Sequence, residues 1–579
     1  MPAILGLNCY KHDSAASLVV DGRTVAAAEE ERFRRIKHFS GYPEKAVDYV
    51  LNEASLSPDE IDHFAFYMLP GLVMRENLFY SPRYLTRSGG LHFLLSQLNG
   101  ARRMKNIGFA LKEHLGGSPE SRVVFVKHHM AHASAAVACS GFRRCAVLTM
   151  DGVGERDTSL LAGYDRGGYT VYSSSRFPHS PGMFYSAVTR YLGFMPDNDE
   201  FKVMGLSSYG QPKYLDLFRE VISCSRGQIR VNTDLLDIHM GVHHAGFSKR
   251  MLREIGPPRR PGEPLDSRHE DIASSAQRVL EEGALSLARY LRKRSGMEKL
   301  VVSGGVGLNC VMNGILERES GFQQVYPLPP SNDAGTSLGA ALEVHRGKYP
   351  NIPLQAPGHM YLGSSYSRGE IRETLETARL AWHTPEDLAD VTAGLIEKGR
   401  IVALFNGRME FGPRALGNRS ILADPRDPDM KDTVNYYVKH REPFRPFCPS
   451  CLVEFAEEYF DGCTDSPYMI KTYPVAAGRE REIPSVTHVD GTARVQTVSR
   501  ETNPFYYSVI EAFRKRTGVP MVLNTSFNVR GEPIVESPLD AVRCFYGTGI
   551  DVLVMPPFLV AKPGVESEIS RLMNHLEGD

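Results

Sequence analysis

Two histidines at helical spacing are the first residues here whose types could support chemistry. His128 and His132 stand in the run HHMAH, which leads into an alanine-rich segment of high helix propensity. Residues four apart lie on the same face of a helix, so both imidazoles would point the same way. Asp151 and Asp333 lie in later turns and can complete the set. Two imidazoles with two carboxylates predict a divalent-metal site, for Fe²⁺ or else Mn²⁺ or Zn²⁺; a histidine-rich surface turn is the alternative.

His12 and Asp13 stand in the turn that follows the first apolar run. An imidazole titrates near neutral pH, so His12 could take a proton from an attacking hydroxyl. The same two residue types also cap and stabilise turns. His12 is therefore a candidate general base, with a turn-stabilising pair as the alternative.

Arginines and lysines interleaved with Gly, Pro and Phe fill three segments after residue 400. The whole chain has 67 Lys and Arg against 68 Asp and Glu, so these local clusters stand out. Cations beside glycine turns predict a pocket for a polyanion such as ATP or carbamoyl phosphate, although a solvated basic face is the alternative. The residues are Arg408, Arg414, Arg419, Lys439, Arg441, Arg445, Asn524, Ser526, Asn528 and Arg530.

A glycine-rich turn, SGGVGLN at residues 303–309, follows the apolar run 300–302. A strand that ends in glycines and feeds a helix lets backbone N–H groups approach a nucleotide. Many such turns are glycine-rich for packing alone. Gly304, Gly305, Gly307 and Asn309 are therefore candidate nucleotide-binding residues.

The elements that must position these residues form a repeated pattern. Residues 4–7, 16–20 and 24–28 read as three strands joined by turns, and residues 146–150, 158–164 and 169–173 repeat that order about 140 residues later. The repetition predicts two related lobes whose first turns face each other. An amphipathic helix over residues 271–291 leads into the strand 300–302.

The proline-rich stretch at residues 349–358 marks the expected domain boundary. After it, apolar strands at 401–405, 520–524 and 552–555 alternate with helical patterns, which predicts a second α/β domain. We expect a first domain at 1–350 with lobes of about 1–140 and 141–350, a linker at 351–363, and a second domain at 364–579. Residues 66–118 and 256–264 read as irregular segments, either facing an acceptor or running over the surface.

Composition narrows the classes of function. Hydrophobic residues make up 42% of the chain, and the net charge is −1, so a nucleic acid or an anionic membrane is not the expected partner. The opening residues lack the pattern of a signal peptide, and no apolar run is long enough to span a bilayer. Nine scattered cysteines, including an incidental C-x-x-C at 448–451, are typical of reduced thiols. We expect a cytoplasmic protein, and a homodimer if it is oligomeric.

Several of these strings together resemble the NodU/CmcH family of O-carbamoyltransferases of natural-product biosynthesis, which includes tobramycin carbamoyltransferase. The resemblance spans the chain. It rests on AEEERFRRIKH, HHMAHASAA, KVMGLSSYG, GGVGLN, SNDAGTSLGAA, FGPRALGNRS, VKHREPFRPFCPS and LNTSFNVRGEPIV, in that order.

The resemblance implies an actin-like, two-lobed N-terminal domain similar to TsaD, followed by an α/β domain similar to YrdC. It implies that the second domain makes carbamoyl adenylate from carbamoyl phosphate and ATP, with Mg²⁺ accompanying ATP, and that the first domain transfers the carbamoyl group to a hydroxyl of a small molecule. The acceptor expected is a macrolide, another polyketide or an aminoglycoside-type antibiotic.

The family's functional positions fall on residues already singled out and on a few others. The metal ligands fall on His128, His132, Asp151 and Asp333, and His12 matches the histidine beside the acceptor. Adenylate handling falls on Arg414, Lys439, Arg494 and Ser526. Further nucleotide contacts are expected from Gly304, Gly305, Gly307, Asn309, Lys202, Arg445, Asn524, Asn528 and Arg530, although the segment before Lys202 departs from the family's pattern.

Two other functions are weighed against this one. A non-catalytic, actin-like ATP-binding regulator would need neither the cationic pocket nor the His/Asp set. An enzyme of tRNA threonylcarbamoylation would have a nucleic-acid partner, which the neutral charge disfavours. Phosphate release with carbamoyl phosphate and a tRNA-binding assay discriminate between the three.

Overall fold

The computed structural model describes residues 1–240 and 245–576. The chain divides into two compact units. The first consists of Met1–Glu31 with His38–Pro357, and the second of Arg32–Lys37 with Gly358–Asp579. The short segment Arg32–Lys37 therefore belongs with the C-terminal part of the chain, which the sequence did not indicate.

The first lobe of the first unit is built on a five-stranded sheet of order β3-β2-β1-β4-β5. Strand β2 pairs antiparallel with both β1 and β3, whereas β4 pairs parallel to β1 and β5 parallel to β4. The strands are β1 (Ala3–Asn8), β2 (Ala15–Val20), β3 (Arg23–Glu29), β4 (His63–Phe66) and β5 (Val123–Phe125).

The second lobe repeats this topology. Its sheet has the order β8-β7-β6-β13-β14, with β6, β7 and β8 antiparallel and β13 and β14 parallel additions beside β6. The strands are β6 (Arg144–Met150), β7 (Asp157–Asp165), β8 (Gly168–Arg176), β13 (Lys299–Ser303) and β14 (Gln324–Pro327). The predicted duplication, and with it the two-lobed actin-like fold, is confirmed.

Helices α6 (His128–Ser140) and α13 (Ala334–Lys348) pack against each other; α6 begins at His128, and Asp333 directly precedes α13. Close approach depends on glycine: a Cβ at Gly339 would lie 1.8 Å from the Ala131 carbonyl oxygen, and one at Gly6 of β1 would lie 1.9 Å from the Ser337 carbonyl oxygen. No other residue type fits at these two positions. Glycine therefore brings α13 against both α6 and the first sheet.

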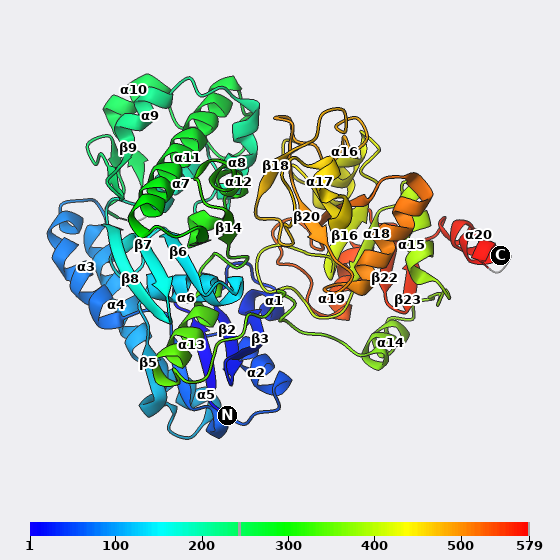
Figure 1. The fold of residues 1–579 in the computed structure, drawn as a ribbon, viewed down its shortest axis with the longest axis horizontal. Helices are drawn as coiled ribbons and strands as arrows, with labels where there is room; N and C mark the ends of the chain where they lie inside the picture. Colours follow the sequence, from blue (N-terminus) through cyan, green and yellow to red (C-terminus); the bar gives the residue numbers. More distant parts are fainter. Residues whose placement is uncertain (241–244, 577–579) are drawn as a thin grey trace. The chain divides into compact units, whose positions relative to one another are not determined.

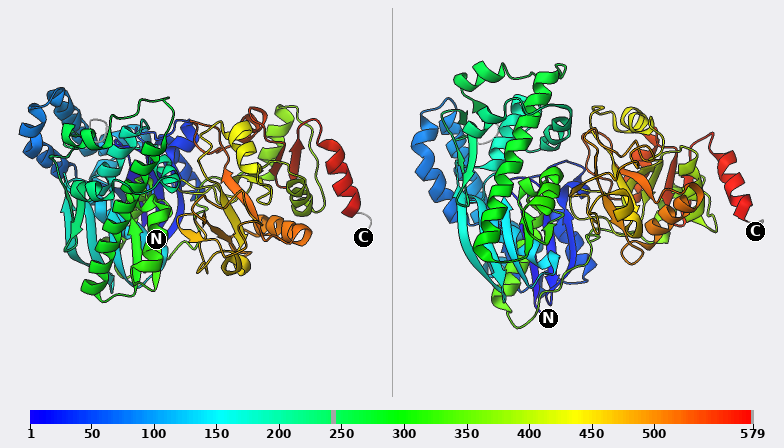
Figure 2. Two further views of the ribbon diagram at one scale, coloured as in Figure 1. Left: turned by 90° about the horizontal axis from the view of Figure 1, so that it is seen from above. Right: turned by 45° about the horizontal axis from the view of Figure 1, so that its top comes forward.

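The longest helix, α11 (Ser267–Ser295), contains the predicted amphipathic segment. Asp266 caps its N-terminus and Gly296 ends it in the left-handed conformation. It packs on β6 and β7, beside which it lies in each view (Figures 1 and 2). Its C-terminus leads into β13, so it places the glycine-rich turn that follows that strand.

Residues 66–118 are mainly helical, and the irregular path expected for them is wrong. They form α3 (Pro70–Leu85), α4 (Gly90–Lys105) and α5 (Ile107–Leu115). Pro70 occupies the first turn of α3, where a missing N–H costs nothing, and Gly89 takes the left-handed conformation between α3 and α4. Some loop formers mark helix ends, whereas Pro82 lies inside α3 and Gly100 inside α4. Residues 256–264, by contrast, form the predicted loop.

Short elements complete the described part of the first unit. They are α2 (Glu44–Glu53), α7 (Pro181–Tyr191), α8 (Glu200–Leu206), α9 (Leu215–Val221), α10 (Lys249–Ile255), α12 (Cys310–Glu319), β9 (Ile222–Ser225), β10 (Gln228–Val231), β11 (Leu236–Asp237) and β12 (Gly246–Phe247). Helix α1 (Glu30–Arg34) runs from the first unit into the segment that belongs to the second.

The second unit is an α/β domain around a seven-stranded mixed sheet of order β20-β17-β21-β16-β15-β22-β23. Helices α15 (Leu388–Glu397) and α18 (Pro504–Thr517) pack against each other, and a large apolar cluster fills the unit. The strands are β15 (Val402–Phe405), β16 (Arg419–Ala423), β17 (Cys448–Leu452), β20 (Gln496–Val498), β21 (Met521–Ser526), β22 (Val552–Met555) and β23 (Phe558–Ala561). This is the additional α/β domain expected of a YrdC-like fold.

Its helices are α14 (Arg368–Thr377), α15 (Leu388–Glu397), α16 (Met430–Val434), α17 (Ala456–Tyr459), α18 (Pro504–Thr517), α19 (Pro538–Tyr546) and α20 (Glu566–Leu576), with a small sheet of β18 (Thr472–Pro474) and β19 (Thr492–Arg494). A π-helical turn, Asn435–Lys439, continues α16. Across residues 1–240 and 245–576, none of the helices is both long and apolar enough to cross a membrane.

Candidate active site

Helix α6 places the two predicted histidine ligands. A carboxylate oxygen of Glu155 accepts hydrogen bonds from the backbone N–H of His128, at 3.1 Å, and of Leu69, at 2.9 Å. A carboxylate at a helix N-terminus satisfies a donor that the helix leaves free. Glu155 therefore fixes where α6 begins, which the sequence analysis did not identify.

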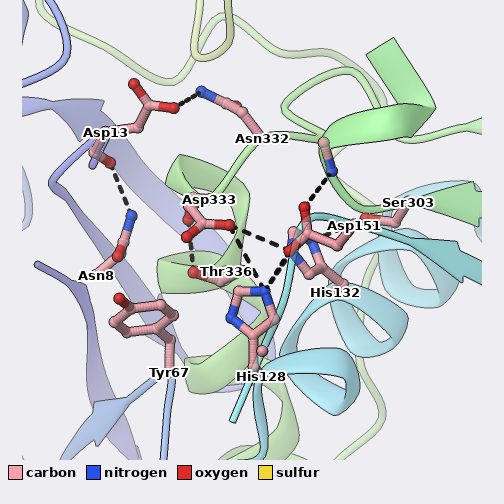
Figure 3. A network of polar contacts seen from close by, with 12 residues as sticks. Asn8, Asp13, Tyr67, His128, His132, Asp151, Ser303, Asn332, Asp333 and Thr336 are labelled. Atoms are coloured by element: carbon pink, nitrogen blue, oxygen red, sulfur yellow. Dashed lines mark hydrogen bonds and ion pairs between the residues drawn. The ribbon is translucent and has the colours of Figure 1, made fainter. Parts of the chain in front are cut away.

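The four predicted metal ligands converge in the interior of the first unit (Figure 3). Asp151 follows β6 and Asp333 immediately precedes α13. His128 Nε2 lies 2.7 Å from Asp151 Oδ2 and 3.6 Å from Asp333 Oδ1. His132 Nε2 lies 3.7 Å from Asp151 Oδ2 and 3.5 Å from Asp333 Oδ1. All four residues are buried, and one ligand atom from each lies within 4.8 Å of the others.

The charges of this cluster fit a divalent cation. Burial alone would lower the pKa of His132, but Asp151 and Asp333 raise it to about 9. Burial would raise the pKa of Asp151, but hydrogen bonds with His128 and His132 hold it well below its ordinary range. Asp151 and Asp333 therefore remain ionised, and in the absence of a cation His132 is protonated. Two imidazole nitrogens and two carboxylate oxygens are donors that Fe²⁺, Mn²⁺ and Zn²⁺ accept in proteins.

Neighbouring groups orient the ligands. Ser303 Oγ lies 3.2 Å from His132 Nδ1, and the backbone N–H of Gly305 donates to Asp151 Oδ1 at 3.0 Å. Such outer contacts set the ring nitrogen and the carboxylate oxygen that face a metal. Two of the predicted glycines, Gly304 and Gly305, therefore lie directly beside the cluster. At Gly304, with φ of 90°, a Cβ would meet the carbonyl oxygen of Met150 at 2.2 Å.

Gly307 and Asn309 lie in the same turn, but their contacts support the local fold rather than the His/Asp cluster. A Cβ at Gly307 would lie 3.0 Å from Ser331 Oγ. Asn309 caps α12 by accepting from the Met312 N–H, and its side chain is also hydrogen-bonded to Gln277. The structure shows no contact of Asn309 with the His/Asp cluster.

His12 lies at the edge of the cluster, with Nε2 at 3.7 Å from Asp333 Oδ2. Its side chain is 41% exposed, so one face of the ring stays open. Burial alone would lower the pKa of His12, but Asp333 and Asp13 raise it to about 10. Lys202, on α8, pairs with Asp199 at 3.0 Å and lies over the ring of Phe194.

In the second unit the structure brings three predicted residues together. Lys439 ends the π-helical turn, and its Nζ contacts the backbone and side-chain oxygens of Ser526 and Asn528, with 2.8 Å to Asn528 Oδ1 and 3.3 Å to Ser526 Oγ. Ser526 Oγ also donates to Asn528 Oδ1 at 2.8 Å. The ammonium group is buried. Burial and the charges of Arg441 and Arg445 lower its pKa well below the ordinary lysine value.

Further arginines surround this lysine. Burial, Arg445 and Arg494 lower the pKa of Arg441, whose guanidinium lies over the ring of Phe447. Arg494 Nε donates to the sulfur of Cys448 at 2.9 Å, and Arg445 Nη1 lies 3.7 Å from Glu442. Neighbouring cations thus lower the pKa of both Lys439 and Arg441, which indicates a site with excess positive charge.

Other predicted residues of this unit have different surroundings. Asn524 is buried on β21 and donates to Ser450 Oγ and Gln496 Oε1. Arg530 is exposed and donates to the His440 carbonyl oxygen, whereas Arg414 is half-buried in the loop before β16. Arg419, also part of the cationic segments, is buried with its guanidinium 3.7 Å from the ring centre of Phe405.

Two family models match the chain. "Carbamoyltransferase N-terminus" matches residues 3–342, and "Carbamoyltransferase C-terminus" matches residues 393–562. The first match alone covers more than half of the sequence.

Several known proteins are similar to this chain over most of its length. The uncharacterized protein sll1178 of Synechocystis is 39% identical over 97% of this chain and 97% of its own length. Nodulation protein NolNO of Sinorhizobium fredii is 38% identical over 96% of this chain and 80% of its own, and NolO of Bradyrhizobium diazoefficiens is 40% identical over 76% and 79%. Among solved structures, component A of (R)-2-hydroxyglutaryl-CoA dehydratase from Acidaminococcus fermentans matches at a TM-score of 0.31 and 14% identity, over 59% of this chain and 97% of that one.

The family follows from the sequence matches. With both halves matched by carbamoyltransferase models, and with full-length relatives close to 40% identical, the chain belongs to the carbamoyltransferase family.

Proposed function

We propose that this carbamoyltransferase is an ATP-dependent O-carbamoyltransferase with two separate reaction sites. The second unit makes carbamoyl adenylate from carbamoyl phosphate and ATP. The first unit transfers the carbamoyl group to a hydroxyl of a small-molecule natural product. The acceptor class is that of macrolides, other polyketides or aminoglycosides.

The observation that carries this proposal is the surroundings of Lys439. Its buried amino group contacts neutral oxygens of Ser526 and Asn528, and it forms no ion pair with a carboxylate of the described residues, so its pKa is lowered. Burying a cation without a counter-charge is unfavourable. The arrangement becomes favourable when a polyanion binds, because the ligand then supplies the missing negative charge. ATP with carbamoyl phosphate fits this requirement.

The chemistry needs ATP because carbamate alone is a poor donor. Hydrolysis of carbamoyl phosphate gives carbamate and phosphate. A carbamate oxygen then attacks the α-phosphorus of ATP, and pyrophosphate leaves with Mg²⁺. Lys439 and the arginines around it would offset the charge that develops on the phosphate oxygens. The product, carbamoyl adenylate, has AMP as its leaving group in place of oxide.

The first unit would carry out the transfer. A cation at the His/Asp cluster would offset the charge of Asp333, which otherwise raises the pKa of His12 and keeps Nε2 protonated. Nε2 of the neutral ring then takes the proton of the acceptor hydroxyl, whose oxygen forms a bond to the carbamoyl carbon, while the bond from that carbon to the AMP oxygen breaks. Gly304 and Gly305 carry no side chain, so the adenylate's phosphate can approach the backbone of the glycine-rich turn beside the cluster. A divalent cation held by His128, His132, Asp151 and Asp333 would supply positive charge for the developing oxyanion.

Product stoichiometry tests the proposal. Purified protein is incubated with ATP, Mg²⁺, Mn²⁺, carbamoyl phosphate and a panel of macrolides and aminoglycosides, and the products are followed by mass spectrometry. We expect one AMP, one pyrophosphate and one phosphate for each acceptor that gains a carbamoyl group. ATP hydrolysis to ADP without any response to carbamoyl phosphate would indicate an actin-like regulator instead, and modification of tRNA would indicate the threonylcarbamoylation alternative.

A further inference from the structure

The side chain of Asp13 joins three other side chains beside the metal cluster. Asp13 Oδ1 lies 2.7 Å from His38 Nδ1, and Oδ2 lies 3.2 Å from His12 Nδ1 and 3.1 Å from Asn332 Nδ2. Asn8 Nδ2 donates to the Asp13 backbone oxygen at 2.8 Å and so holds the turn itself (Figure 3). Asp13 is buried, at 8% exposure, although it lies between β1 and β2.

These contacts determine which nitrogen of His12 carries hydrogen. Burial alone would raise the pKa of Asp13, but the bonds to His12 and His38 hold it below the ordinary value, so Asp13 is a carboxylate. An ionised carboxylate only accepts hydrogen bonds, and therefore His12 Nδ1 is the donor. The other nitrogen, Nε2, is left to face Asp333 and the open side of the site.

His38 has an acceptor at each of its ring nitrogens. Its Nε2 lies 2.7 Å from Asn198 Oδ1. The Asn198 amide cannot turn round without losing a bond, because its Nδ2 donates to Asp199 at 2.8 Å. With Asp13 at Nδ1 and the amide oxygen at Nε2, both nitrogens of His38 must donate. His38 is then an imidazolium cation, and Glu31, which accepts from the His38 backbone N–H at 2.8 Å, adds a second carboxylate close by.

We propose that Asp13 is a positioning residue for His12 and that His38, as an imidazolium, holds Asp13 in place. The inference rests on the proposed role of His12 as the base of the transfer step. As His12 Nε2 receives the acceptor's proton, positive charge appears on the ring, and the Nδ1–H bond to Asp13 orients the ring and stabilises that charge. The Asp13 carboxylate also accepts a hydrogen bond from Asn332, the residue before the proposed metal ligand Asp333. Asp13 therefore contacts both the base His12 and the turn that carries Asp333.

A second metal site is the competing interpretation, because ligand atoms of Asp13, Glu31 and His38 also lie within 4.8 Å of one another. A cation there would displace the proton between His38 Nδ1 and Asp13, and it would compete with the bonds that Asp13 Oδ2 accepts from His12 and Asn332. We therefore favour positioning, and the stoichiometry of Mn²⁺ binding separates the two.

Asp13→Asn is the decisive variant. Asp13 has φ of 54°, a conformation that asparagine tolerates, and the amide keeps the size of the side chain. One of its two polar atoms is now a donor, so it cannot accept from His12 and His38 together. We expect kcat for transfer to fall by about 10²–10⁴, with acceptor KM, carbamoyl-phosphate-dependent ATP–pyrophosphate exchange and Mn²⁺ binding unchanged. Asp21→Asn is the matched control, because Asp21, with φ of 51°, occupies the next turn of the same sheet.

Histidine ¹⁵N NMR reports which ring nitrogens carry hydrogen, and this would not change if Asp13 only supported the fold. In the native protein near pH 7.5, with resonances assigned from His12→Asn and His38→Gln, His38 should show two protonated nitrogens. In Asp13→Asn, compared with the native protein with Zn²⁺ bound in both and at a pH where the His12 ring is neutral, the ring should no longer favour the tautomer with hydrogen on Nδ1. Near-native transfer by Asp13→Asn, or a neutral His38 ring, would overturn the proposal. Two Mn²⁺ per native chain and one in Asp13→Asn would also overturn it in favour of a second metal site. If His12→Asn itself transfers normally, the proposed function of His12 fails rather than the role of Asp13.

Discussion

His128 Nε2 and His132 Nε2 lie 3.2 Å apart, one turn apart on α6, with their rings nearly perpendicular. Two imidazole nitrogens at that distance share one proton or one metal ion, because two protons would collide and two lone pairs would repel. With Asp151 and Asp333 against the same pair, the local charge favours a cation. The geometry therefore links metal binding to proton release.

Metal affinity should rise with pH. His132 has a pKa of about 9 without metal, so at neutral pH a cation must displace its proton. Between pH 7 and 8.5 the apparent affinity for Mn²⁺ should rise by up to about tenfold per pH unit for each proton released. Calorimetric titration in buffers of different ionisation enthalpy counts the protons. An affinity independent of pH would show that His132 is not a ligand.

The close packing of α13 against α6 should be needed for metal binding at the His/Asp cluster. In Gly339→Ala the new Cβ would lie 1.8 Å from the Ala131 carbonyl oxygen, so α13 and α6 must move apart. We expect a loss of about 1–3 kcal/mol in unfolding free energy, and weaker Mn²⁺ binding because the two helices carry Asp333, His128 and His132. Gly347→Ala, on the same helix with nothing within 4 Å, should instead stabilise by about 0.5–1 kcal/mol. Urea denaturation of both variants measures the difference, and equal effects would contradict the packing argument.

Most of the correct predictions from the sequence rest on the spacing of residues within one helix or one strand. The His128–His132 pair and the duplicated strand pattern are local features, and the structure has both. The partners of Asp13 could not be predicted, because His38, Asn198 and Asn332 come from distant segments and no period in the sequence relates them. The prediction for residues 66–118 is wrong because glycine and proline, which resemble the composition of a loop, lie here at helix ends and, for Pro82 and Gly100, inside helices.

The stability of the second unit should depend on pH through Lys439. The pKa of this buried lysine lies well below the ordinary value near 10.5, so below 10.5 the unfolded chain binds a proton that the folded chain does not. Unfolding free energy should therefore rise with pH from the lowered pKa up to about 10.5, and this rise should disappear in Lys439→Met. Lys398→Met, at an exposed position of the same unit, is the control. Urea midpoints at pH 7, 8 and 9 give the slope, and the same slope in both variants would mean that Lys439 stays charged in the ligand-free protein.

The two half-reactions should separate by mutation, since their residues lie in different units. Lys439→Met removes the buried cation of the second unit, so carbamoyl-phosphate-dependent exchange of pyrophosphate into ATP should fall by at least about 10². His132→Ala removes one of the four proposed metal ligands in the first unit, so transfer should be lost while exchange stays near the native rate. Lys398→Met and His92→Ala, both at exposed positions, control for the loss of a lysine and of a histidine. Mixing the two defective proteins tests whether free carbamoyl adenylate can pass from one chain to another. If His132→Ala, folded by circular dichroism, lost exchange as completely as Lys439→Met, activation and transfer could not be assigned to separate sites.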